Sequence, residues 1–93
     1  MAVTRASLIA LYEEFTPADS TMVTNKIAAA EDFVDEDVWG DRYDFAVTLY
    51  ACHLIAMGPY GMEMGLVVKN GETTYLRQYN DEAILSGSAW RMG

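Results

Sequence analysis

The sequence predicts a mainly α fold: a small helical bundle of three main helices with a C-terminal β-hairpin or extended arm. Apolar residues recur at helical spacing as far as residue 57, and Gly58-Pro59 then interrupts the pattern. Further along, Asn70-Gly71 separates two short runs, and this dipeptide is the strongest two-residue signal for a hairpin. The 93 residues allow a single domain, in which residues 1–60 form the helical bundle and residues 61–93 the hairpin and arm.

The first helix is predicted over Thr4 to Phe15, because apolar side chains there share one helical face. Four residues follow the i, i+3, i+4, i+7 spacing: Leu8, Leu11, Tyr12 and Phe15. Thr16-Pro17 ends the helix, since the residue before a proline avoids helical geometry.

The second helix is predicted to begin at Asp19 or Ser20, either of which can cap it. Its apolar stripe consists of Val23, Ile27, Ala30, Val34 and Val38. Gly40 suits the left-handed position that ends a helix.

The third helix is predicted to start at Asp41, whose carboxylate can accept from free N–H groups of the first turn. Asp44 adds negative charge near the positive end of the helix dipole. The body, Tyr43 to Met57, is apolar almost all round, and such a helix has to be buried on every side. Two partner helices, one of them short, can hardly enclose it, so the composition predicts self-association.

The corner between the second and third helices is predicted to have a structural role. Trp39 is a large apolar residue at the helix end, Gly40 permits the reversal, and Asp41 caps the next helix. Tyr43 can fold back near Trp39. We therefore expect a helical hairpin whose corner is fixed by packing and capping.

The C-terminal third contains the predicted hairpin. Its strands are Leu66 to Lys69 and Glu72 to Leu76, with Lys69 opposite Glu72, Val68 opposite Thr73 and Leu66 opposite Tyr75. A lone hairpin is barely stable, so it either docks with the tail on an adjacent subunit or the next protein, or folds back on its own helices. The candidate subunit or partner interface is Tyr50, Leu54, Leu66, Tyr75 and Trp90.

Acidic residues dominate the charge: the net charge is −8, with 14 acids against 6 bases. Such a surface repels phosphate and argues against a sequence-specific nucleic-acid interface. Half of the acids fall in one stretch: Glu31, Asp32, Asp35, Glu36, Asp37, Asp41 and Asp44. They can form a solvated helix face, a divalent-metal site or the negative wall of a channel, although the pattern of a calcium-binding loop is absent.

No catalytic signature is recognised, whether a glycine-rich phosphate loop, G-x-S-x-G or H-E-x-x-H. Cys52 and His53 are helix neighbours whose side chains point about 100° apart, so they cannot act as a pair. We expect His53 to be buried and hydrogen-bonded and Cys52 to be an inert core residue. No catalytic residue, metal site or cofactor is predicted, and the protein is not expected to be an enzyme.

The longest apolar stretch, Phe45 to Met57, has about 13 residues, whereas a membrane-spanning helix needs about 20. The segment starting at Met1 lacks the long apolar core of a signal peptide. The single cysteine cannot form an internal disulfide, which suits a reducing compartment. We therefore expect no membrane partner.

Several sequence pieces occur together at a recognisable spacing. The most specific are Trp39-Gly40-Asp41-Arg42-Tyr43-Asp44 and Ala51-Cys52-His53-Leu54, which fit the patterns W-G-x-x-Y-D and A-x-H-L. Before them come Glu14-Phe15-Thr16-Pro17 and the alanine-rich run Ile27-Ala28-Ala29-Ala30. Over roughly residues 8–61 the chain thereby resembles the head–tail connector or adaptor proteins of tailed phages, a family of small helical head-completion proteins.

The resemblance implies a virion structural protein without catalysis or cofactor. It implies a homo-oligomeric ring, dodecameric in the family, that lies beneath the portal and contacts the portal protein and a tail or neck protein. Its location would be the head–tail junction of the virion, after synthesis in the host bacterial cytoplasm. Relatives often carry a longer C-terminal segment with Gly and Ser, whereas here that region is short and contains Asn70-Gly71.

The alternative is a small acidic, phage-encoded interaction module that binds a single host or phage protein. Its acidity could mimic nucleic acid and occupy a basic groove. A stable monomer that is absent from purified particles would favour this alternative.

Overall fold

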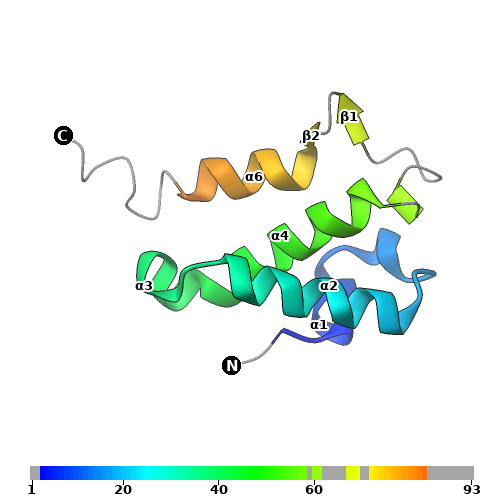
Figure 1. The fold of residues 1–93 in the computed structure, drawn as a ribbon, viewed down its shortest axis with the longest axis horizontal. Coiled ribbons are helices and arrows are strands. Elements are labelled where there is room, and N and C mark those ends of the chain that lie inside the picture. The colour runs from blue at the N-terminus through cyan, green and yellow to red at the C-terminus, as the bar shows by residue number, and fades with distance from the viewer. Residues whose placement is uncertain (1–2, 59, 62–66, 70–71, 84–93) are drawn as a thin grey trace.

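The chain is mainly helical in a computed structural model that describes residues 3–58, 60–61, 67–69 and 72–83. Figure 1 shows the central helix α4 (Tyr43–Met57) between α2 (Ser20–Phe33) and α6 (Thr74–Ala83). The predicted mainly α class is confirmed. Within the described part of the chain, no helix is long and apolar enough to cross a membrane.

The predicted first helix is divided into two pieces, α1 (Arg5–Leu11) and the short 3₁₀ helix η1 (Glu13–Phe15). Thr4 caps α1: its hydroxyl accepts from the Ser7 N–H at 3.2 Å, and the Ser7 hydroxyl accepts from the Thr4 N–H at 3.0 Å. At Tyr12 the backbone leaves helical geometry. The turn that follows places Phe15 in the core, with no exposed surface.

The predicted second helix is also divided. Asp19 caps α2 by accepting from the Met22 N–H at 2.9 Å, as expected. The helix ends where Val34 adopts extended geometry, and α3 (Glu36–Trp39) then begins, so the predicted continuous stripe as far as Val38 is wrong. The cause is local, because the Asp35 carboxylate accepts from the Asp37 N–H at 2.9 Å and starts a new helix.

Gly40 ends α3 with a φ of 56° and a ψ of −125°. The positive φ is as expected, but this ψ lies outside the left-handed helical well and suits only glycine. A 3₁₀ turn, η2 (Gly40–Arg42), then leads into α4, whose N-cap is Arg42 without a side-chain hydrogen bond. The prediction that Asp41 caps the helix is wrong, because the extra turn moves the N-cap of α4 to Arg42 and leaves the Asp41 carboxylate exposed.

The central helix is enclosed by its own chain. Its buried residues lie on every side: Ala46, Val47, Thr48, Leu49, Ala51, Cys52, His53, Ile55 and Ala56. On one side α4 packs against α2 and on another against α6, a helix that the sequence analysis did not predict. The argument that α4 requires a second subunit for its burial is therefore wrong, because α6 supplies the missing cover.

The C-terminal third differs from the predicted hairpin and arm. A short antiparallel pair joins β1 (Val67–Lys69) to β2 (Glu72–Thr73), with Lys69 opposite Glu72 and Val67, rather than Val68, opposite Thr73. The predicted turn Asn70-Gly71 lies outside the described residues, so the hairpin stays a prediction. Residues 74–76 were expected to be strand but are helical, because the Thr73 hydroxyl accepts from the Leu76 N–H at 3.1 Å and starts α6.

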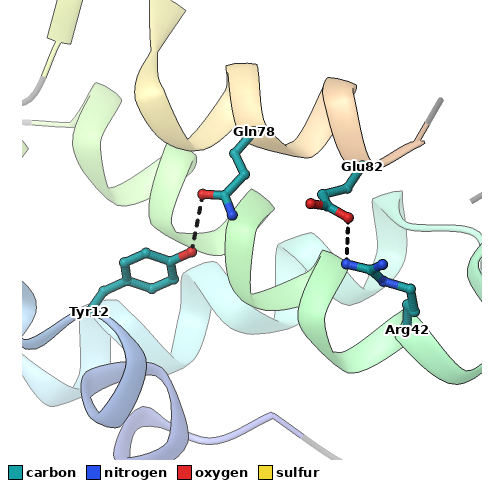
Figure 2. A network of polar contacts seen from close by, with 4 residues as sticks. All are labelled: Tyr12, Arg42, Gln78 and Glu82. Carbon is teal, nitrogen blue, oxygen red and sulfur yellow. Dashed lines mark hydrogen bonds and ion pairs between the residues drawn. The ribbon is translucent and has the colours of Figure 1, made fainter. Parts of the chain in front are cut away.

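Polar side-chain contacts help to hold α6 against the rest of the chain. The Tyr12 hydroxyl donates to Gln78 Oε1 at 3.4 Å, and Arg42 pairs with Glu82, as Figure 2 shows. The Tyr75 hydroxyl donates to the Glu14 carboxylate. Over Thr74–Ala83 the predicted extended arm is therefore wrong, since this segment packs against α4.

The segment after α4 returns to the body through Tyr60 and Gly61. The Tyr60 hydroxyl donates to the Glu14 carbonyl at 2.7 Å. Gly61 is buried, and a Cβ there would lie 1.8 Å from the Ala56 carbonyl oxygen. This glycine therefore permits a close contact between the two backbone segments.

Replacement of Gly40 by alanine should lower the free energy of unfolding by about 1–3 kcal/mol, because the backbone there is strained for any side chain. A Cβ at this position meets nothing within 4 Å, so the cost should come from the backbone alone. Urea denaturation measures it. The control is Gly58→Ala, whose Cβ would lie in ordinary contact at 3.5 Å from the Ile55 oxygen and should change stability by about 0.5 kcal/mol at most. Equal effects of the two variants would contradict the backbone argument.

Candidate functional site

Five aromatic rings from four helices form a cluster, which we call the aromatic cluster. Its members are Phe33 of α2, Trp39 of α3, Tyr50 and His53 of α4, and Tyr79 of α6. The cluster brings together residues that lie far apart in the sequence. Its formation depends on the packing of α6 against α4.

The rings form a series of contacts that runs from the exposed Phe33 to the buried Trp39. Phe33 stacks on Tyr50, with centroids 4.2 Å apart and an angle of 9° between the planes. Tyr79 lies 5.4 Å from Tyr50 and 5.0 Å from Trp39, which is buried. His53 lies 5.6 Å from Tyr50. Contacts of this kind contribute about 0.5–1.5 kcal/mol each beyond the buried area.

Phe33 is the exposed member of the cluster, with 58% of its surface accessible. Most large apolar residues of the described chain are buried, and the other exposed ones are Leu11 and Met57. Exposure of one large apolar residue is ordinary by itself. Phe33 differs because its ring is held in a fixed orientation by the stacking on Tyr50.

Exposed carboxylates flank Phe33 in the sequence. Asp32, Asp35 and Glu36 are all exposed. Burial raises the pKa of Tyr79, and hydrogen bonding with Trp39 opposes this shift. The nearby Asp35 carboxylate adds a smaller contribution that also raises the pKa. The described residues contain no group of three His, Cys, Asp or Glu side chains placed to hold a metal ion.

Three of the four predicted corner residues, Gly40, Asp41 and Tyr43, line a depression of about 210 Å³. Its walls are Glu36, Gly40, Asp41, Tyr43 and Asp44. Tyr43 donates its hydroxyl to the Glu31 carbonyl at 3.3 Å, which joins the start of α4 to the end of α2. Burial and the carboxylates of Glu31 and Glu36 raise the pKa of Tyr43. Trp39, in turn, packs against Tyr79 of α6.

The buried titratable groups of α4 have structural environments. His53 Nδ1 lies 2.9 Å from the Thr73 hydroxyl, and burial lowers the pKa of His53. The prediction of a buried, hydrogen-bonded histidine is confirmed. Cys52 is buried as expected, and burial raises the pKa of its thiol well above the usual range. A thiol that stays protonated is a poor nucleophile.

Of the five predicted interface residues, those that the structure describes differ in their burial. Tyr50 and Leu54 are half-buried, so each retains accessible surface. Tyr75 is buried among the residues of its own chain, 5.4 Å from the rings of both Tyr12 and Phe15, and the prediction that it faces a partner is wrong. Leu66 and Trp90 lie outside the described residues.

The exposure of Phe33 was not predicted from the sequence. It lies off the apolar stripe of the second helix, between Asp32 and the buried Val34. A large apolar residue on the polar side of an amphipathic helix is the signal that could have identified it.

Replacement of Thr73 by valine should lower the free energy of unfolding by about 1–3 kcal/mol, because two buried polar groups lose their partner. These groups are His53 Nδ1 and the Leu76 N–H. Thr73→Ser keeps the hydroxyl and serves as the control, so it should retain more stability in urea denaturation. If serine and valine destabilise the protein equally, the hydroxyl does not matter.

The pH dependence of stability should carry a contribution from His53. Its pKa is lowered in the folded state, so the unfolded chain binds the proton more readily. The contribution of His53 to the free energy of unfolding should therefore be fully present above about pH 6.5 and be lost as the pH falls below it. The slope from this group should be at most about 1.4 kcal/mol per pH unit. In His53→Asn that part of the slope should disappear from denaturation curves measured between about pH 5.5 and 7.5. An unchanged slope in the variant would show that His53 does not contribute.

Comparison with known proteins finds no match, whether to a protein-family model, a curated protein or a solved structure. The function therefore has to be argued from the residues and their geometry.

Proposed function

We propose that the chain is a virion structural protein, a head–tail connector or adaptor subunit that forms a ring between the portal and the tail. One observation carries this proposal: W-G-x-x-Y-D at residues 39–44 is followed by A-x-H-L at residues 51–54. Both patterns resemble those of the connector family at the family's spacing. The proposed location is the head–tail junction of the virion.

The roles of the motif residues support a protein that acts through its shape. Gly40 adopts a backbone conformation that suits glycine, and Tyr43 ties α4 to α2. Trp39 and His53 are buried, and each contacts a residue outside its own helix. Motif residues that fix a corner and a central helix agree with the expectation that the protein is not an enzyme and needs no cofactor.

The charge also supports a position on a channel through which DNA passes. The net charge of −8 makes a surface that repels the phosphate backbone rather than holding it. The partners proposed from the family are further copies of the chain in a dodecameric ring, the portal protein, and a tail or neck protein. Tyr50 and Leu54 remain proposed contact residues, together with Leu66, Trp90 and the predicted hairpin.

The second candidate function is an acidic interaction module that binds one host or phage protein. The exposed Phe33 ring, which exposed carboxylates flank in the sequence, favours it, because an aromatic anchor with a charged edge is a common form of protein-binding surface. An interaction module of this kind does not need to assemble into a ring of subunits.

Mass spectrometry and electron microscopy of purified virions test the connector proposal. We expect the chain in particles at a fixed ratio to the portal protein, as density between portal and tail. Particles made without the chain should have filled heads that lack stable tails, and the chain supplied in trans should restore them. A stable monomer by light scattering, absent from virions whose tails assemble normally, would contradict the proposal and favour the interaction module.

A further inference from the structure

We propose that the exposed Phe33 ring and the carboxylates beside it bind an arginine-bearing segment of a basic partner protein. This inference is independent of the connector proposal, because it concerns the chemistry of one surface and not the place of the protein in a particle. We call this surface, made of Phe33, Asp32, Asp35 and Glu36, the acidic aromatic surface.

The stacked pair gives this surface an open ring face. Phe33 lies parallel to Tyr50 at 4.2 Å, so one face of its ring is covered. Because 58% of the residue is still accessible, the opposite face remains open to solvent. Tyr50 is itself fixed by Tyr79 and His53. A ring already held in place loses little conformational freedom when a second planar group stacks on it.

A guanidinium group fits this arrangement better than other side chains. It stacks on an aromatic face, and its N–H groups pair with carboxylates in a two-pronged geometry. The exposed carboxylates of Asp32, Asp35 and Glu36 flank Phe33 in the sequence and supply the acceptors. A contact of the same kind occurs among the described residues, since the Arg42 guanidinium lies 5.2 Å from the centre of the Phe45 ring.

The surrounding charge selects a basic partner. Residues 31–44 contain seven of the 14 acids and one base, Arg42. That base is paired with Glu82 of α6. The stretch therefore carries a strong negative potential, which attracts a cationic segment and accelerates its association.

A second copy of this chain is a poor occupant of the surface. Each copy has a net charge of −8, so two copies repel each other over long distances. Among the 6 basic residues, Arg5 donates to the Thr16 carbonyl at 2.8 Å and Arg42 is paired within the chain. The charge complementarity points to a different protein that is basic.

Binding of three synthetic peptides by the full-length chain tests the proposal. The peptides share one Gly- and Ser-based sequence with two variable positions, which hold arginine, lysine or citrulline. Citrulline keeps the planar shape of arginine without its charge. Fluorescence anisotropy of the labelled peptides at low ionic strength should give affinities in the order arginine, lysine, citrulline, and added salt should weaken the first two.

Two variants locate the binding. Phe33→Ala should weaken the arginine peptide by about two- to fivefold, which corresponds to the loss of one exposed cation–aromatic contact. Asp35→Asn should weaken it as well, while the asparagine still caps α3 and keeps the fold. The controls are Leu11→Ala, another exposed apolar residue, and Glu13→Gln, another exposed carboxylate, and both should bind as the unaltered chain does.

Three results would overturn the proposal. The citrulline peptide could bind as tightly as the arginine peptide, which would remove the role of charge. Phe33→Ala could bind as the unaltered chain does, which would leave only non-specific attraction to an acidic protein. Finally, Phe33→Ala could abolish self-association seen by light scattering and leave peptide binding intact, in which case the occupant is a second copy of the chain.

Discussion

The Thr73 hydroxyl is the contact on which the arrangement of this fold depends. Thr73 has no exposed surface, and its oxygen lies 3.1 Å from the Leu76 nitrogen and 2.9 Å from His53 Nδ1. It therefore starts α6 and joins it to the middle of α4 at one point. In the neutral tautomer of His53 that carries its proton on Nε2, the Thr73 hydroxyl accepts from Leu76 and donates to Nδ1, so each group has a partner. If α6 did not pack against α4, a large part of the α4 surface would be exposed to water.

The sequence predicted those elements whose signals are local. The cap of α2, the positive φ of Gly40 and the burial of Cys52 and His53 follow from capping chemistry and helical spacing. The start of α6 could not be predicted in this way, because Thr74 and Tyr75 favour strands and follow a hairpin signal. Tertiary packing outweighs that preference: Tyr75 and Tyr79, four residues apart, share the helical face that packs inward.

The candidate site shows the same division between local and tertiary signals. Tyr50 was predicted as a contact residue, and it retains accessible surface within the aromatic cluster. Phe33 lies off the apolar stripe, which indicates exposure, but the sequence does not show which rings it contacts. The Asp35 cap ends the helical stripe after Phe33 and redirects the chain, while Tyr50 and Tyr79 come from helices that follow later. Which aromatic residues meet could be learned only from the packing of all these helices.

The position of α6 has a consequence for the order of events during synthesis. Its contacts with the N-terminal region join Tyr75 to Glu14 and Gln78 to Tyr12, pairs separated by 61 and 66 residues. A nascent chain that has emerged only as far as Met57 has α4 with one side covered by α2 and the side that later meets α6 still open. Until Thr74–Ala83 leaves the ribosome, this apolar side is available to chaperones and to other nascent chains. Folding of the helical body is therefore completed only after Thr74–Ala83 has been made, because the central helix needs the cover of that segment.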